Sequence, residues 1–339
     1  MTTIYLGANH GLGVVRFKND RWRAAIELVG LQVQCLAADP HRPERVYCGT
    51  FGRGLWRSDD AGASWAPVAD GIPYADVMSV AVSPLERHGR QGVVWAGTEP
   101  SALFRSEDGG DTWRERPALR ELPSAPTWSF PPRPWTHHVR WITPDPCVAE
   151  RIFVGIELGG VMRSRDAGLT WEDRKRGSQL DAHTLSAHRL APGRIYEAAG
   201  GGYAESRDGG ESWRGFDEGL RHHYLWGLAV DPADPETILI AAARGPREAH
   251  SDAFAEATIY RRTSGPAWQE VRMGLPRPKG TRIYVLAAND AEPGVFFAAT
   301  AGNLYRSADA GVTWERLDVT WPDGYRTKVV HAMVVVHTS

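Results

Sequence analysis

Short runs of alternating apolar and polar residues recur along the chain, separated by glycine, proline and aspartate. VQCLAADP (33–40) and LWGLAVDP (225–232) share one pattern, and each is followed by a second apolar run, RVYCGT (45–50) and RIYEAAG (194–200). Runs of this length between turn residues are typical of β-strands in antiparallel sheets. We therefore expect an all-β protein.

A nine-residue string lies between these runs and repeats through the sequence. RSEDGGDTW (105–113) is closely matched at 57–65, 163–171, 205–213 and 306–314, and decayed copies end at Trp22 and Trp268. The seven tryptophans that end the strings are 42 to 58 residues apart, which is close to the length of a propeller blade. The sequence predicts one domain, residues 1–339, folded as a seven-bladed β-propeller of four-stranded antiparallel blades.

The two ends of the chain are expected to share a blade. We label the strands of a blade A to D from the central channel outward. The chain begins with a B strand at Thr3–Ala8, and the missing A strand is found in KVVHAMVVV (328–336). Closure of this kind removes the open sheet edges that favour aggregation.

The repeated string resembles the Asp-box, or BNR, repeat S-x-D-x-G-x-T-W. Five copies match this pattern well, and with the two eroded copies they cover nearly the whole chain. The resemblance implies a propeller related to sialidases, xyloglucan-active glycosidases, sortilin-type receptors and photosystem assembly factors. It also implies that the string is a structural turn between strands C and D, away from the active face, so the motif identifies the fold and hardly the function.

Two long connections point to the opposite face. Residues 117–136 join a D strand to the next A strand and are rich in Trp, Phe and Pro, while residues 244–257 join a B strand to a C strand. Long connections in compact repeats are usually functional or disordered. We therefore expect both insertions on the functional face.

The A strands, aligned by their shared pattern, predict a polar mouth above an apolar channel. The opening positions are Gln32, Asp76, His138, Asp181, Tyr224, Arg282 and Lys328. Two residues further on stand Gln34, Met78, Arg140, His183, Trp226, Tyr284 and Val330. The next positions inward are all apolar: Leu36, Val80, Ile142, Leu185, Leu228, Leu286 and Ala332.

This mouth is the predicted site for a small polar or anionic ligand, because converging polar groups and aromatic walls are typical of binding pockets. The candidate catalytic residues are Glu157, Asp181, His183, His138 and Tyr224. The candidate substrate-binding residues are Arg140, Arg282, Lys328, Trp128, Trp226, Tyr284 and His137. Arginine forks suit carboxylate or phosphate groups, and carboxylates and imidazoles can serve as acid or base.

A metal-assisted enzyme is one form of this hypothesis. The candidate ligands are His138, His183, His223 and His10, and imidazole with carboxylate suits Zn, Fe, Ni or Cu. No HExxH or other short-spaced ligand motif supports it.

Two alternatives stay open. One is a non-catalytic scaffold that binds a protein or peptide through residues 117–136. The other is a glycoside hydrolase whose two carboxylates come from Glu99, Glu157, Asp76 and Asp181. A sialidase is disfavoured, because that resemblance implies six blades and an arginine triad.

Composition limits which binding partners and which cellular compartment we expect. A net charge of −2 gives no general attraction to nucleic acid or to anionic membranes, and no apolar run reaches the about 20 residues of a membrane span. The first residues resemble a strand rather than a signal peptide, and three cysteines without a CxxC motif fit reduced thiols. We therefore expect a cytoplasmic protein without nucleic-acid or membrane partners.

Overall fold

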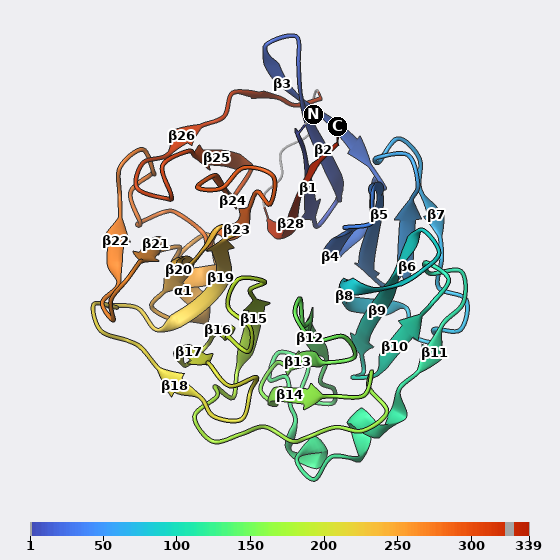
Figure 1. Ribbon diagram of the computed structural model, residues 1–339. Helices are drawn as coiled ribbons and strands as arrows, with labels where there is room; N and C mark the ends of the chain where they lie inside the picture. The colour runs from blue at the N-terminus through green and yellow to red at the C-terminus, as the bar shows by residue number, and fades with distance from the viewer. Residues whose placement is uncertain (1, 323–328, 339) are drawn as a thin grey trace.

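Seven antiparallel sheets are arranged in a ring around a central channel (Figure 1). The computed structural model describes residues 2–322 and 329–338. The predicted all-β, seven-bladed propeller is confirmed. No helix in these two ranges is long and apolar enough to cross a bilayer.

The blades follow one another in chain order, and within each the strands run outward from the channel. The innermost strands are β28 (Val330–His337), β4 (Gln32–Asp39), β8 (Asp76–His88), β12 (Val139–Pro144), β15 (Ala182–Ala187), β19 (Tyr224–Asp231) and β23 (Val285–Ala288). The second strands are β1 (Thr2–Ala8), β5 (Arg42–Phe51), β9 (Gln91–Glu99), β13 (Ile152–Ile156), β16 (Ile195–Ala199), β20 (Asp234–Ala243) and β24 (Phe296–Thr300). The third strands are β2 (Gly11–Lys18), β6 (Leu55–Ser58), β10 (Leu103–Ser106), β14 (Gly160–Ser164), β17 (Gly202–Ser206), β21 (Ala257–Arg262) and β25 (Asn303–Ser307). The outer strands are β3 (Arg21–Glu27), β7 (Ala66–Pro67), β11 (Arg114–Glu115), β18 (Arg214–Gly215), β22 (Gln269–Val271) and β26 (Glu315–Arg316).

The first blade is closed by the end of the chain, as predicted. Strand β28 pairs antiparallel with β1, from Thr2 opposite His337 to Ala8 opposite Val330. A short strand, β27 (Val319–Thr320), adds to the outer edge of this blade parallel to β3, so the sheet has five strands.

The fourth blade departs from the four-stranded pattern. Its fourth strand is reduced to one bridge between Arg163 and Glu172. The residues that follow bind the 117–136 insertion instead: Asp173 accepts a hydrogen bond from the Ser124 backbone, and Arg174 donates to Thr127. Contacts with the insertion therefore replace a regular edge strand.

The five well-matched strings fold into the same hydrogen-bonded turn. In the third blade, Ser106 Oγ donates to Asp108 and accepts from the Gly110 amide, and the Thr112 amide and hydroxyl both donate to Asp108. The other four copies repeat this network. The position of Gly110 has a positive φ and is glycine in all five copies, whereas the position of Gly109, also at positive φ, is alanine in three of them.

The tryptophans at the ends of the strings pack between neighbouring blades. Trp113 is 6% exposed, joins an apolar cluster with Tyr47 of the preceding blade, and donates its indole N–H to the Val68 carbonyl. Trp268 does the same against Phe216 of the fifth blade. Burying aromatic area at each blade interface holds the ring together.

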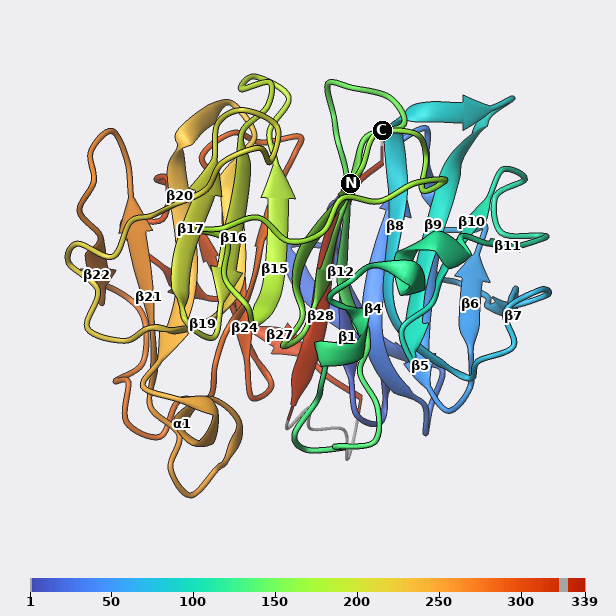
Figure 2. The ribbon, with the colours of Figure 1, turned by 90° about the horizontal axis from the view of Figure 1, so that it is seen from below.

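Both insertions carry short helical turns. The first contains η1 (Pro117–Glu121) and η2 (Ala125–Thr127), and the second contains α1 (Pro246–His250). In Figure 2, α1 and the green loop that leads to β12 lie at the same edge of the ring. Parts of both insertions line one pocket at the channel mouth.

Candidate functional site

A pocket of about 670 Å³ opens at the channel mouth. Its lining includes seven of the predicted catalytic and substrate-binding residues: His138, Arg140, Glu157, Asp181, Tyr224, Trp226 and Arg282. Below it, the channel narrows to a cavity of about 80 Å³ lined by Leu36, Val80, Ile142, Leu228 and Leu286 among others. A polar mouth therefore lies above a largely apolar channel.

β-Bulges aim side chains of the innermost strands at the channel. In six of the seven strands the pairing register skips a residue near the mouth. The skipped positions are Gln34, Met78, Arg140, His183, Trp226 with Gly227, and His331. A bulge leaves one residue unpaired and redirects its side chain, which is why bulges occur beside functional sites.

Side chains of the neighbouring blade bind several carbonyls at these bulges. His183 Nδ1 lies 2.6 Å from the Leu225 carbonyl oxygen, Thr184 donates to the Trp226 carbonyl, and Ser79 donates to the Val139 carbonyl. The bulged geometry at the mouth is thus fixed by contacts between blades.

His138 lies between two carboxylates. Its Nε2 is 3.0 Å from Glu157 Oε2, and its Nδ1 is 3.2 Å from Glu99 Oε2, where the angle gives an ion pair rather than a hydrogen bond. Burial would lower the pKa of His138, but its contacts with the Glu157 and Glu99 carboxylates outweigh burial and raise that pKa. Contact with two carboxylates therefore favours the imidazolium form of His138.

Both carboxylates beside His138 are held ionised. Burial opposes this, yet hydrogen bonding and charge from His138 bring the pKa of Glu157 to about 2. The pKa of Glu99 also falls to about 2, because hydrogen bonds from Arg133 and the nearby His138 ring outweigh its burial. Glu157 has a second cationic neighbour, since Arg140 Nε lies 3.8 Å from the same Oε2.

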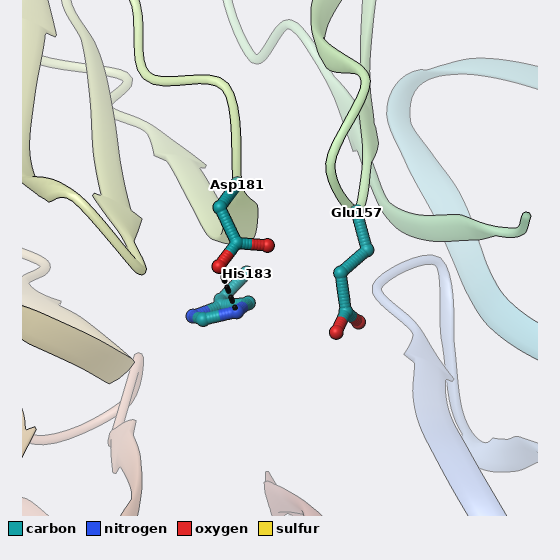
Figure 3. Close-up of side chains that lie close together, drawn as sticks. All are labelled: Glu157, Asp181 and His183. Carbon is teal, nitrogen blue, oxygen red and sulfur yellow. Dashed lines mark ion pairs between the residues drawn. The ribbon is translucent and has the colours of Figure 1, made fainter. Parts of the chain in front are cut away.

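Asp181 and Glu157 line the pocket, and His183, which is buried and outside the pocket lining, lies beside Asp181 (Figure 3). One ligand atom from each of the three residues lies within 4.8 Å of the others, and His183 Nε2 is 3.5 Å from Asp181 Oδ2. Gly200 leaves the space for this carboxylate, because a Cβ there would lie 1.9 Å from Asp181 Oδ2. Asp181 is partly exposed, whereas His183 is fully buried.

Aromatic rings form one wall of the pocket. Trp226 stacks under the guanidinium of Arg140, 4.5 Å from its ring centre. Tyr224 Oη lies 3.1 Å from His250 Nε2, and burial lowers the pKa of His250 to about 4. On the insertion, Phe130 packs edge-on against His138. The pocket thus combines flat apolar faces with charged groups.

Several predicted site residues lie elsewhere. Trp128 is buried in an apolar cluster with its indole N–H bound to Ser124, and His137 packs against it. Tyr284 is 1% exposed in another core cluster. None of these three side chains belongs to the described pocket lining. Lys328 lies outside the described residues.

The predicted four-histidine metal set is not assembled in residues 2–322 and 329–338. His10 and His223 are exposed and do not line the pocket, and His138 is held by its carboxylates. Only His183 belongs to the group of potential ligands at the mouth, together with Glu157 and Asp181.

The register expected for the closing strand was wrong by one residue. Pairing with β1 skips His331, so His331 rather than Val330 corresponds to Gln34 of the second blade. His331 lines the pocket and contacts Asn9, and burial lowers its pKa to about 4. A one-residue shift exchanges the two faces of a strand, which is why the alignment missed this histidine.

The curated proteins whose sequences resemble this chain include xyloglucan-active enzymes. No protein-family model matches the chain. An oligoxyloglucan reducing-end-specific xyloglucanase from Emericella nidulans is 29% identical over 157 residues, which are 42% of this chain and 18% of that protein. A xyloglucanase from a Paenibacillus species is 25% identical over 328 residues, covering 83% of this chain and 30% of its own length. The chain thus spans less than a third of these curated relatives.

Solved structures agree on the architecture. An ancestral GH74 enzyme superposes with a TM-score of 0.64 at 17% identity, covering 89% of this chain and 37% of that one. The structure of YCF48 bound to D1 peptide superposes with a TM-score of 0.58 at 18% identity, covering 84% of this chain and 81% of that one. At these identities the likeness establishes the fold alone.

Proposed function

We propose that this protein is a glycoside hydrolase acting on a β-glucan-type oligosaccharide such as a xyloglucan fragment. One observation carries the proposal: carboxylates from two neighbouring blades, Glu157 and Asp181, converge on the floor of a pocket with aromatic walls. Both named relatives support the substrate class. The repeated turns support the further inference that the strings are Asp-box repeats.

The proposed roles follow from the environment of each carboxylate. Glycosidic bond cleavage uses one carboxylate that stays ionised and a second that delivers a proton to the leaving oxygen. His138 and Arg140 hold Glu157 ionised, so Glu157 is the proposed nucleophile. Asp181, partly exposed and with Oδ1 lacking a hydrogen-bond partner, is the proposed proton donor.

The spacing favours double displacement. Oxygens of the two carboxylates approach within 4.8 Å, whereas a pair that activates a water between them is about 6.5–9.5 Å apart. We therefore expect retention of configuration at the anomeric carbon.

The rest of the pocket fits a sugar. The indole of Trp226 and the ring of Phe130 offer flat apolar faces for pyranose rings, and Gln32, Gln34 and Asn9 can hydrogen-bond hydroxyls. A volume of about 670 Å³ is in the range of small-molecule sites.

The test is hydrolysis of a panel of xyloglucan and other β-glucan oligosaccharides, assayed in chelator and followed by chromatography. Glu157→Gln and Asp181→Asn should each lower the rate by about 10²–10⁴-fold. Glu256→Gln and Asp252→Asn, on the 244–257 insertion and outside the pocket lining, are the matched controls. Folded wild-type protein that cleaves nothing in the panel, or pocket variants as active as their controls, would refute the proposal.

A second candidate is a peptide-binding scaffold. Trp135 on the 117–136 insertion is 80% exposed, and exposed tryptophans are common anchors in protein interfaces. The structure of YCF48 bound to D1 peptide superposes over 84% of this chain and 81% of its own. Under this proposal Trp135→Ala abolishes partner binding, while Asp181→Asn leaves it unchanged.

A further inference from the structure

We propose that Asp181, His183 and Glu157 form a binding site for a divalent transition metal, with Zn²⁺ as the intended ion. The proposal goes beyond sugar hydrolysis and does not depend on it. It starts from the buried imidazole of His183.

The hydrogen bond of His183 fixes which nitrogen is free. Its Nδ1 lies 2.6 Å from the Leu225 carbonyl oxygen, which can only accept, so Nδ1 carries the proton. In the neutral ring, Nε2 then presents a lone pair. That nitrogen is fully buried, has no hydrogen-bond partner, and points toward Asp181 Oδ2 at 3.5 Å.

Such an imidazole is prepared for a metal. Ligating histidines commonly donate their other ring N–H to a carbonyl or carboxylate, which fixes the tautomer and the ring orientation. Here the ring is also packed against Tyr224 and Trp226, with centroids 5.0 and 4.7 Å away. The ring therefore needs no rotation to offer Nε2.

The neighbouring oxygens complete a group made only of acceptors. Asp181 Oδ1 is buried without a hydrogen-bond partner, and a Glu157 oxygen lies within 4.8 Å of both other ligand atoms. The contacts of His138 and Arg140 with Glu157 involve Oε2, which leaves Oε1 outside both contacts and able to bind a metal. Unpaired acceptors facing one another repel, and a cation between them removes that repulsion.

The donor set selects the type of ion. One imidazole nitrogen and two carboxylate oxygens suit Zn²⁺, with bonds of about 2.0–2.2 Å. The three groups would move closer on binding, and the fourth position would face the open pocket. The positive charges of Arg140 and His138 beside Glu157 disfavour the binding of a metal cation. We therefore expect a moderate affinity and an ion that exchanges with solvent.

The experiment uses the full chain, free of any histidine tag and stripped with chelator. Zn²⁺ is titrated by calorimetry, and Co²⁺ is added as a spectroscopic probe of nitrogen and oxygen ligation. We expect one ion per chain, and at least about 10-fold weaker binding in Asp181→Asn and His183→Gln. Asp252→Asn and His223→Gln, which alter exposed residues outside the pocket lining, should bind as wild type does.

Two outcomes would overturn the inference. One is folded wild-type protein that does not bind about one equivalent of Zn²⁺. In that case ¹⁵N spectra should show both nitrogens of His183 protonated, because a proton then lies between His183 Nε2 and Asp181 Oδ2. The other is Asp181→Asn that binds as tightly as Asp252→Asn. Asp181 is partly exposed, so its variant remains informative if His183→Gln fails to fold. Sugar hydrolysis is assayed in chelator, so either proposal can fail without the other.

Discussion

Arg133 and Glu99 meet in a two-pronged ion pair, with Nε and Nη2 of the guanidinium each 2.5 Å from one carboxylate oxygen. Arg133 belongs to the 117–136 insertion, and Glu99 ends β9 and also contacts His138. This contact joins the insertion to the charged groups of the pocket.

Arg133→Gln should loosen the insertion. The substitution leaves the buried Glu99 carboxylate with His138 as its main charged neighbour, and we expect about 1–3 kcal/mol of lost stability. Limited proteolysis should cut near 128–137 faster than in wild type. Arg120→Gln is the control, because its ion pair with Glu115 is more exposed. Equal cleavage in both variants would mean that Arg133 does not hold the insertion.

Glu197→Gln should stabilise the protein at alkaline pH. Burial raises the pKa of Glu197 to about 8, and its Oε2 accepts the Gln179 amide, a bond that glutamine retains. Because the pKa of Glu197 is higher in the folded state, its contribution to stability is complete below about pH 4.5 and is lost as the pH rises toward 8. In urea at pH 8, the free energy of unfolding of the variant should therefore exceed that of wild type by on the order of 1–3 kcal/mol. The two free energies should converge near pH 4.5. A constant difference across this range would contradict the assignment.

His250→Gln should reduce the loss of stability in mild acid. Burial lowers the folded pKa of His250 to about 4, so its contribution is present above about 6.5 and lost as pH falls toward 4. Wild type should lose on the order of 2–3 kcal/mol more than the variant across this window. Parallel unfolding curves measured at pH 7 and pH 4.5 would show that His250 is not buried as a neutral ring.

Asp108→Ala should weaken the frame without altering the site. The substitution removes hydrogen bonds to Ser106 and Thr112 in one repeat turn, and we expect a loss of about 1–2 kcal/mol on unfolding. Hydrolysis and Zn²⁺ binding at a temperature where the variant is folded should match wild type. A selective loss of either would place this turn in the functional site.

Zn²⁺ should inhibit hydrolysis if both proposals hold. The ion would bind Glu157 and Asp181, the two carboxylates assigned to bond cleavage, so metal and chemistry exclude each other. Activity should fall with added Zn²⁺ and return with chelator. Activation by Zn²⁺ would mean that the carboxylates are metal ligands first, and that the proposed nucleophile is wrong.

The blade count and the closure could be predicted because the repeated string marks each blade and its tryptophan fills each interface. The mouth positions Arg140, Asp181 and Trp226 were likewise accessible, since the A strands share one pattern. The β-bulges could not be predicted. The register skip at His331 depends on pairing with β1, and no local sequence signal marks it.

Trp128 and Tyr284 illustrate a second limit. An aromatic residue in a proline-rich insertion can face a ligand or the core, and composition does not distinguish them. The turn η2 directs Trp128 inward, where Ser124 accepts its N–H. Conversely, the value of His183 as a ligand depends on the Leu225 carbonyl of the next blade, a contact that only the folded ring creates.

The closed first blade also determines how the ring responds to mechanical force. Thr2 pairs with His337 at one end of the β1–β28 ladder, so tension applied at residues 2 and 338 acts on that end. The hydrogen bonds between β1 and β28 would break one after another, as in unzipping, rather than all at once in shear. A pulling experiment should therefore show the ring opening at this seam, at low force, before any other blade unfolds.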